Sequence, residues 1–398
     1  MTIASQQPIA EVTAAGIAAL RGAAPQPERL VALPSWSRQE AAAAAAALAN
    51  TTGGLVIIGA SAGAAGAVTA FTGTDVPEAE LAAVARDLGP AGPFLVETAA
   101  FDIDGKRVAV LRVGECADTP VVVETDGGVY RRAGGETLRL TTRQALDELY
   151  AKSRRLRERA ETNLEALLAR IAFGHFNYMT IAVAAAPRFP GSAAYEWAQQ
   201  DPAAVVDPAL GFARRWGLDA SSLEVTPGEL SFILPADDTG FVRIVRNGCV
   251  AVGLRMRRPA QDRYLSPADF SALLAEMAEL LSRPFQANRY GLVLGAAFLE
   301  GVRDLRLPVE GGLTAPVRRD LVQEHLPERY LHDASERAAF TQDLQAAVGA
   351  VFNADLVNGT GEPYAGHVAP LSVEPKTWHG TTKRTERRLA GARGHGSV

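Results

Sequence analysis

Two adjacent arginines, Arg131 and Arg132, are the residues whose type and spacing best fit ligand chemistry. One pair of glycines precedes them, and a second pair follows at Gly134-Gly135. Guanidinium groups donate hydrogen bonds in a fixed planar arrangement that matches the oxygens of phosphates and carboxylates. The alternative is a pair of strand residues that form salt bridges with nearby acids such as Glu124 and Glu136. The pattern therefore predicts either an anion-binding strand or an ion-paired structural strand.

A helix, a tight corner and a buried strand are predicted over residues 38–59. Ala41 to Ala49 is almost entirely alanine, which loses no side-chain entropy in a helix. Leu55 to Ile58 is an apolar, β-branched run typical of a buried strand. Between them lie polar residues that favour local bonds to the backbone, followed by two glycines suited to a left-handed turn. These corner residues are Asn50, Thr51, Thr52, Gly53 and Gly54.

Patterns that mark common enzyme sites are missing from the sequence. Gly59, Gly63 and Gly66 do not have the spacing of a dinucleotide-binding loop, and we predict a loose loop over residues 59–68. The chain contains no Gly-Lys-Ser/Thr, H-E-x-x-H or G-x-S-x-G pattern. Cys116 and Cys249 are its two cysteines, so neither a disulfide framework nor a cysteine-rich zinc site is supported. We predict no catalytic residue, no metal site and no cofactor.

Charge is distributed unevenly along the 398 residues, whose net charge is −5. Residues 1–150 are acidic, whereas residues 376–398 contain lysines and arginines with a single acid. The charge of the folded parts therefore does not indicate a nucleic-acid-binding surface, while the basic tail could contact any polyanion. No apolar stretch has the roughly 20 residues needed to span a bilayer, and the N-terminus does not resemble a signal peptide. We expect a cytoplasmic protein without a membrane partner.

The predicted fold class is α/β with an α+β second half. We predict an N-terminal helix at residues 1–24, a mixed α/β domain at 25–150 and a linker helix at 151–173. An α+β domain with an antiparallel sheet follows at 174–356, because residues 230–256 form three strand patterns separated by turns. Arginines alternate with glutamates in the linker helix, which is typical of a solvated face. Residues 357–398 are predicted to be a disordered basic tail.

The first half resembles a known family. Ala47–Gly59 reads ALANTTGGLVIIG. Tyr130-Arg131-Arg132-Ala133-Gly134 follows at the expected distance, with Pro120 before it and Thr137 after it. These residues resemble the Schlafen-type, AlbA-like DNA-binding domain, over roughly residues 25–150. The resemblance implies a mixed α/β fold and a nucleic-acid- or anion-binding role. The residues to which it gives that role are Asn50, Thr51, Gly53, Gly54, Arg131 and Arg132.

Two departures from the family pattern concern its nuclease members. The family opens with two acids and a lysine, whereas the matching stretch here keeps Glu28 alone. Aspartates often follow the strand in the family, but Ala60-Ser61-Ala62 stands there. Holding a hard catalytic cation requires several convergent carboxylates. We therefore expect no nuclease activity of the kind found in those relatives.

These observations favour a non-enzymatic nucleic-acid-binding protein with a degenerate nuclease-like site and, as one option, a regulatory role. One alternative is a protein-interaction scaffold or ligand sensor. Another is a divergent metal-dependent nuclease that recruits acids such as Asp75 or Asp102. Self-association into a homo-oligomer is left open by the sequence.

Overall fold

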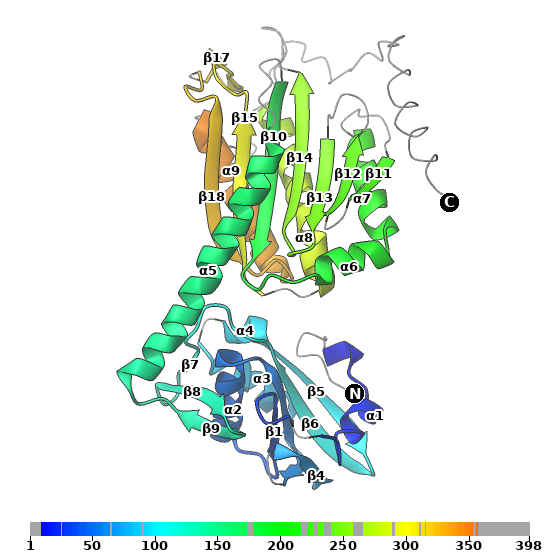
Figure 1. Ribbon diagram of the computed structural model, residues 1–398, viewed down its shortest axis with the longest axis vertical. Coiled ribbons are helices and arrows are strands. Elements are labelled where there is room, and N and C mark those ends of the chain that lie inside the picture. Colours follow the sequence, from blue (N-terminus) through cyan, green and yellow to red (C-terminus); the bar gives the residue numbers. More distant parts are fainter. Residues whose placement is uncertain are drawn as a thin grey trace, which may run out of the picture.

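A single long helix, α5 (Arg143–Ile171), connects two separate β-sheets in the computed structural model (Figure 1). The structure describes residues 9–24, 26–63, 66–89, 91–172, 178–215, 222–226, 229–234, 240–257, 266–288, 291–309, 312–314, 316–352 and 356. The predicted basic tail lies outside these residues. The predicted fold class, a mixed α/β domain followed by an α+β domain, is confirmed.

The first sheet has four strands in the order β1-β2-β6-β5. β1 runs parallel to β2, and the other neighbours are antiparallel. The strands are β1 (Leu30–Leu33), β2 (Gly54–Ile58), β5 (Val96–Ile103) and β6 (Lys106–Val113). Thus β2, the predicted buried strand, lies inside the sheet and all its residues are buried.

The alanine-rich helix α2 (Arg38–Asn50) covers one face of this sheet. Ser37 caps the helix by accepting a hydrogen bond from the amide of Glu40. Almost all of the helix from Ala41 onward is buried, so the small side chains allow the backbone to lie close to its neighbours. Two further helices, α3 (Glu78–Arg86) and α4 (Gly92–Leu95), complete this side of the domain.

The opposite face of the sheet is covered by short elements that the sequence did not reveal. Residues 59–68, predicted to be a loose loop, instead contribute β3 (Ala60–Ala62), which pairs with β4 (Val68–Phe71). The hairpin forms because Ala60, Val68 and Phe71 are buried against this face. Residues 1–8 of the predicted N-terminal helix lie outside the described residues, and residues 9–24 contain a 3-10 turn, η1 (Ile9–Glu11), and a short helix, α1 (Ala14–Ala18).

A three-stranded sheet leads from the first sheet into α5. It consists of β7 (Val122–Val123), β8 (Gly128–Ala133) and β9 (Glu136–Arg139), all antiparallel. β8 packs on α2, and this contact brings the arginine pair beside the Asn-Thr-Thr-Gly-Gly corner.

α5 begins earlier than the linker helix predicted at residues 151–173. The expected boundary between residues 150 and 151 falls inside it, because no glycine or proline interrupts the helix and its apolar stripe continues. The N-terminal half packs on the first domain through Leu149, and the C-terminal half packs on the second sheet through Leu164 and Leu168. The predicted linker is therefore part of both packed regions.

The second sheet has seven strands, all antiparallel, in the order β11-β12-β13-β14-β10-β15-β18. Its strands are β10 (Tyr178–Pro187), β11 (Ser222–Thr226), β12 (Glu229–Leu234), β13 (Gly240–Val245), β14 (Val250–Arg257), β15 (Val293–Glu300) and β18 (Leu321–Arg329). A small separate hairpin joins β16 (Pro308–Val309) to β17 (Gly312–Leu313). The predicted strands at residues 230–256 are present, whereas β18 was missed because its sequence, LVQEHLPER, is mostly polar.

α5 lies on one face of the second sheet, and four helices cover the other face (Figure 1). These are α6 (Ala193–Gln200), α7 (Ala203–Arg215), α8 (Pro267–Asn288) and α9 (Ala334–Phe352). The largest apolar cluster of the protein lies between them and the sheet. No helix within the described part of the chain combines the length and the apolar character needed to cross a bilayer.

The two domains meet around the buried guanidinium of Arg188. It donates to the backbone oxygen of Ser153 on α5 at 2.9 Å and to the carboxylate of Glu328 on β18 at 2.9 Å. Beside it, the rings of Phe94 and Tyr330 stack with centroids 4.5 Å apart. The first domain is thus joined to the second by packed side chains as well as by α5.

Both cysteines are free and buried, and their burial predicts a dependence of stability on pH. Burial raises the pKa of the Cys116 thiol from 9.0 to about 11. Above pH 9 the unfolded thiol ionises while the folded thiol stays neutral, so the free energy of unfolding falls as pH rises toward 11. Cys116→Ala removes this contribution. From about pH 8 to about pH 10, the free energy of unfolding of wild type should therefore fall by about 1 kcal/mol more than that of Cys116→Ala, as measured in denaturant titrations. A difference that stays constant over this range would contradict a buried neutral thiol.

Candidate anion-binding surface

The side chain of Asn50 lies inside the first domain and joins three backbone groups. Its amide nitrogen donates to the carbonyl oxygens of Val121 and Tyr130, both at 2.9 Å, and its oxygen accepts from the amide of Val121 at 2.7 Å. Asn50 is buried, so these bonds replace water for otherwise isolated backbone groups. The structure therefore places this predicted binding residue in a role that fixes β8 to the end of α2.

Thr51 makes a second connection between the corner and β8. Its hydroxyl donates to the carbonyl oxygen of Ala47 at 2.7 Å and accepts from the amide of Arg132 at 3.1 Å. Together with Asn50, it fixes the position of the arginine pair along the helix end.

The guanidinium of Arg132 is buried and directed into the protein. It donates to the carbonyl oxygens of Pro27 and Gly135 and to the hydroxyl of Thr137, at distances from 2.6 to 3.2 Å. Desolvation lowers the pKa of Arg132, and the charges of Glu28 and Glu136 oppose that shift. The expected salt bridge is thus replaced by bonds to neutral oxygens, which hold the β8–β9 turn against the segment before β1.

Gly53 and Gly54 form the turn itself, with φ angles of +68° and +150°. A side chain on Gly53 would place its Cβ 2.8 Å from backbone atoms of Val113 and Glu115. At Gly54 the Cβ would lie 2.6 Å from the carbonyl carbon of Arg29. The predicted left-handed corner is present, and both glycines are required by backbone that passes close to them.

Arg131 is the one member of the predicted site whose side chain reaches the surface. It lies opposite Leu138 of β9 in the hairpin register, and 42% of its side chain is exposed. Its Nη1 lies 2.9 Å from the Oε2 of Glu148 on α5. Because an exposed ion pair contributes little to stability, this guanidinium can exchange its partner for an external anion at small cost.

Lys152 of α5 belongs to this surface and was not identified from the sequence. Its Nζ donates to the carbonyl oxygen of Thr51 at 2.9 Å and lies 2.6 Å from the Oε1 of Glu115. A cation beside the carbonyls at the C-terminus of α2 is favoured by the helix dipole. The sequence predicted a solvated face for the linker helix, so its contact with the corner is seen only in the tertiary structure.

The carboxylate of Glu28, the remaining acid of the family pattern, is held by backbone. Its Oε1 accepts a hydrogen bond from the amide of Gly134 at 2.9 Å. Among the described residues, no group of three or more His, Cys, Asp or Glu side chains is placed to hold a metal ion. Asp75 and Asp102, the acids named for a divergent nuclease, therefore do not form such a group with Glu28 in that part of the chain. The expected absence of metal and cofactor stays a prediction.

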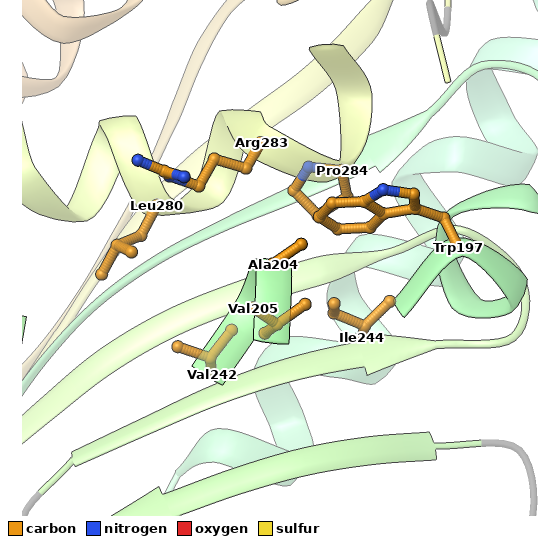
Figure 2. Close-up of a pocket in the computed structure, with 8 residues that line it drawn as sticks. All are labelled: Trp197, Ala204, Val205, Val242, Ile244, Leu280, Arg283 and Pro284. Carbon is orange, nitrogen blue, oxygen red and sulfur yellow. The ribbon is translucent and has the colours of Figure 1, made fainter. Parts of the chain in front are cut away.

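The second domain contains a small pocket between α7, α8 and β13 (Figure 2). Trp197, Val205 and Pro284 contribute apolar walls, and Arg283 lies at its edge. The empty space in it is about 240 Å³, a figure that includes space open to solvent. We assign no ligand to it.

Residues 33–141 match the family model described as Schlafen, AlbA_2. The N-terminal part of the chain therefore contains an AlbA-like domain of this kind, as the resemblance indicated. The matched segment includes the corner and the arginine hairpin, whereas α5 and the second domain lie outside it.

Two solved structures are similar to part of this chain, each at 18% sequence identity. One is the DIP2311 protein from Corynebacterium diphtheriae, with 28% of this chain and 25% of that chain covered and a TM-score of 0.23. This chain thus spans a quarter of that protein. The other is the N-terminal domain of a protein from Nitrosomonas europaea described as related to the ATP-dependent DNA helicase RecG. It covers 33% of this chain and 95% of that domain, also with a TM-score of 0.23. No curated protein matches the chain.

Proposed function

We propose that this chain binds nucleic acid through its AlbA-like domain and does not cleave it. The observation that carries the proposal is the placement of Arg131. Its guanidinium is exposed on a hairpin that Asn50, Thr51 and Arg132 fix to the end of α2. A preorganised guanidinium suits a phosphate oxygen because little conformational freedom is lost on binding. The Schlafen, AlbA_2 match of residues 33–141 supports a nucleic acid as the source of that phosphate.

The surroundings of Glu28 support the non-cleaving part of the proposal. Phosphodiester hydrolysis by a metal-dependent nuclease needs carboxylates that converge on the cation. Here the carboxylate of Glu28 accepts a bond from the amide of Gly134, and β3 (Ala60–Ala62) carries no carboxylate. The protein that we propose is therefore a regulatory, cytoplasmic one that binds nucleic acid without cleaving it.

The test is a titration of the full-length protein with fluorescently labelled single-stranded RNA, single-stranded DNA and duplex DNA. Affinity should fall as salt is raised from about 50 to about 200 mM, because binding to phosphates releases counterions. Arg131→Ala should weaken binding several-fold. Arg143→Ala is the matched control, since Arg143 is an exposed arginine that is ion-paired to Asp147 on the same helix. Binding to none of the three nucleic acids at low salt would overturn the proposal.

The same samples test cleavage. With magnesium or manganese added, the labelled strands should stay intact. Cleavage that Glu28→Ala abolishes would instead establish the divergent nuclease.

A further inference from the structure

The charged residues of α5 are unevenly distributed around the helix. Lys152, Arg155 and Arg159 are spaced by three and four residues and therefore share one side. An acidic row occupies a different side, about 100° or more around the helix axis. Its members are Asp147, Glu158, Glu161 and Glu165. Arg143, Arg154 and Arg157 lie among these acids and Glu148 lies on the side of Lys152, so both sides are mixed, and the excess of positive charge is on the side of Lys152.

Ion pairs and hydrogen bonds show which way the basic side faces. Lys152 reaches the carbonyl oxygen of Thr51, so this side faces the corner of the AlbA-like domain. Glu148, one turn earlier on the same side, contacts Arg131. Three turns after Arg159, Arg170 forms an ion pair with Glu229 on β12. The side therefore runs from the arginine hairpin of the first domain toward the sheet of the second (Figure 1).

Arg155 and Arg159 are the available charges on this side. Both are exposed, and neither has an ion-pair partner within the described residues. Arg157, which points elsewhere, contrasts with them because it is paired with Glu161 and lies near Glu328. Two unpaired guanidiniums one helical turn apart leave local positive potential on this side of α5.

We propose that Arg131, Lys152, Arg155 and Arg159, named here the basic row, hold the phosphate backbone of a single-stranded nucleic acid. This rests on the proposed function and extends the binding surface beyond the segment that matches the family. A row on one side of a helix, whose whole diameter is about 10 Å, is wide enough for one backbone. On the other side of α5, the arginines lie among acids and two of them are ion-paired, Arg143 with Asp147 and Arg157 with Glu161, so that side offers no second basic row for the other strand of a duplex. The contacts are to phosphates, so binding is independent of base sequence.

The test compares two double variants that change the net charge equally. Arg155→Glu with Arg159→Glu reverses the free charges of the basic row, whereas Arg143→Glu with Arg154→Glu makes the same change on the acidic side of α5. The basic-row variant should bind a labelled single-stranded oligonucleotide at least tenfold more weakly than wild type. The control should stay within about threefold of wild type, because exposed charges elsewhere on the protein contribute through screened long-range attraction alone. Circular dichroism and thermal melting verify that both variants fold.

Salt dependence gives a second readout with neutral substitutions. Arg155→Gln with Arg159→Gln removes two phosphate contacts, so the slope of log affinity against log salt should become shallower by about 1.4 for a single strand. Equal affinity and slope for this variant and wild type would overturn the basic row while leaving the proposed function standing. A variant Arg155→Gln with Arg159→Gln that loses binding to duplex DNA but keeps wild-type binding to single strands would also overturn the basic row. Absence of binding by wild type would instead remove the proposed function itself.

Discussion

Replacing Gly54 with alanine is expected to lower the free energy of unfolding of the AlbA-like domain by about 3 kcal/mol or more. The residue has φ +150°, a conformation that residues with a side chain rarely adopt. The added Cβ would also lie 2.6 Å from the carbonyl carbon of Arg29 and closer still to its oxygen. That carbonyl accepts the amide of Leu55 at the start of the pairing between β1 and β2. Relief of the clash would therefore break the parallel pair.

Gly105→Ala is the control for this substitution. Gly105 also has a positive φ, +74°, but no atom lies within 4 Å of the position its Cβ would take. It should lose about 1 kcal/mol, the cost of a left-handed backbone alone. Denaturant titrations followed by circular dichroism measure both losses. A Gly54→Ala variant no less stable than Gly105→Ala would show that the backbone beside β1 can move aside without cost.

Replacing Arg188 with alanine is expected to destabilise the protein by about 3–5 kcal/mol. Its side chain is 3% exposed and connects α5 to β18 through Ser153 and Glu328. Removing the guanidinium leaves the carboxylate of Glu328, which is itself largely buried, without its nearest cation. The packing of β18 against α5 would lose this buried charge pair.

Two further variants separate the buried charge from simple loss of an arginine. Arg157 also lies near the carboxylate of Glu328, at 3.8 Å, but 57% of its side chain is exposed, so Arg157→Ala should cost less than 1 kcal/mol. Arg188→Met with Glu328→Gln removes both charges and should recover part of the stability lost in Arg188→Ala. Equal losses for Arg188→Ala and Arg157→Ala in denaturant titrations would contradict a stabilising role for the buried pair.

The structure gives most residues of the family motif a structural role, and the binding role that the resemblance implies for them stays a prediction. Asn50, Thr51 and Arg132 were expected to contact an anion, yet their side chains bond to backbone and hydroxyl oxygens of the same domain. A short polar residue at a helix end satisfies local backbone groups and external ligands equally well, so sequence alone does not separate the two roles. Arg131, one position from Arg132, points to the opposite side of the strand and reaches the surface.

Elements with strong local signals were predictable, and elements that depend on distant partners were not. The alanine helix, the double-glycine turn and the buried strand each follow from intrinsic propensity over a few residues. β18 and the β3–β4 hairpin carry weak apolar patterns and form because they pair with strands and pack on a sheet that the rest of the chain builds.

The sequence by itself determined the AlbA-like domain, the helix–corner–strand unit at its centre and the antiparallel character of the second sheet. Tertiary structure decided which arginine is buried and which is exposed, because alternation along β8 assigns faces only once the strand has packed on α2. Tertiary structure also decided that the predicted linker helix contributes Lys152 to the candidate anion-binding surface. Lys152 is distant in sequence from the corner and contacts it because α5 returns past Thr51, and the same course of α5 places Glu148 beside Arg131.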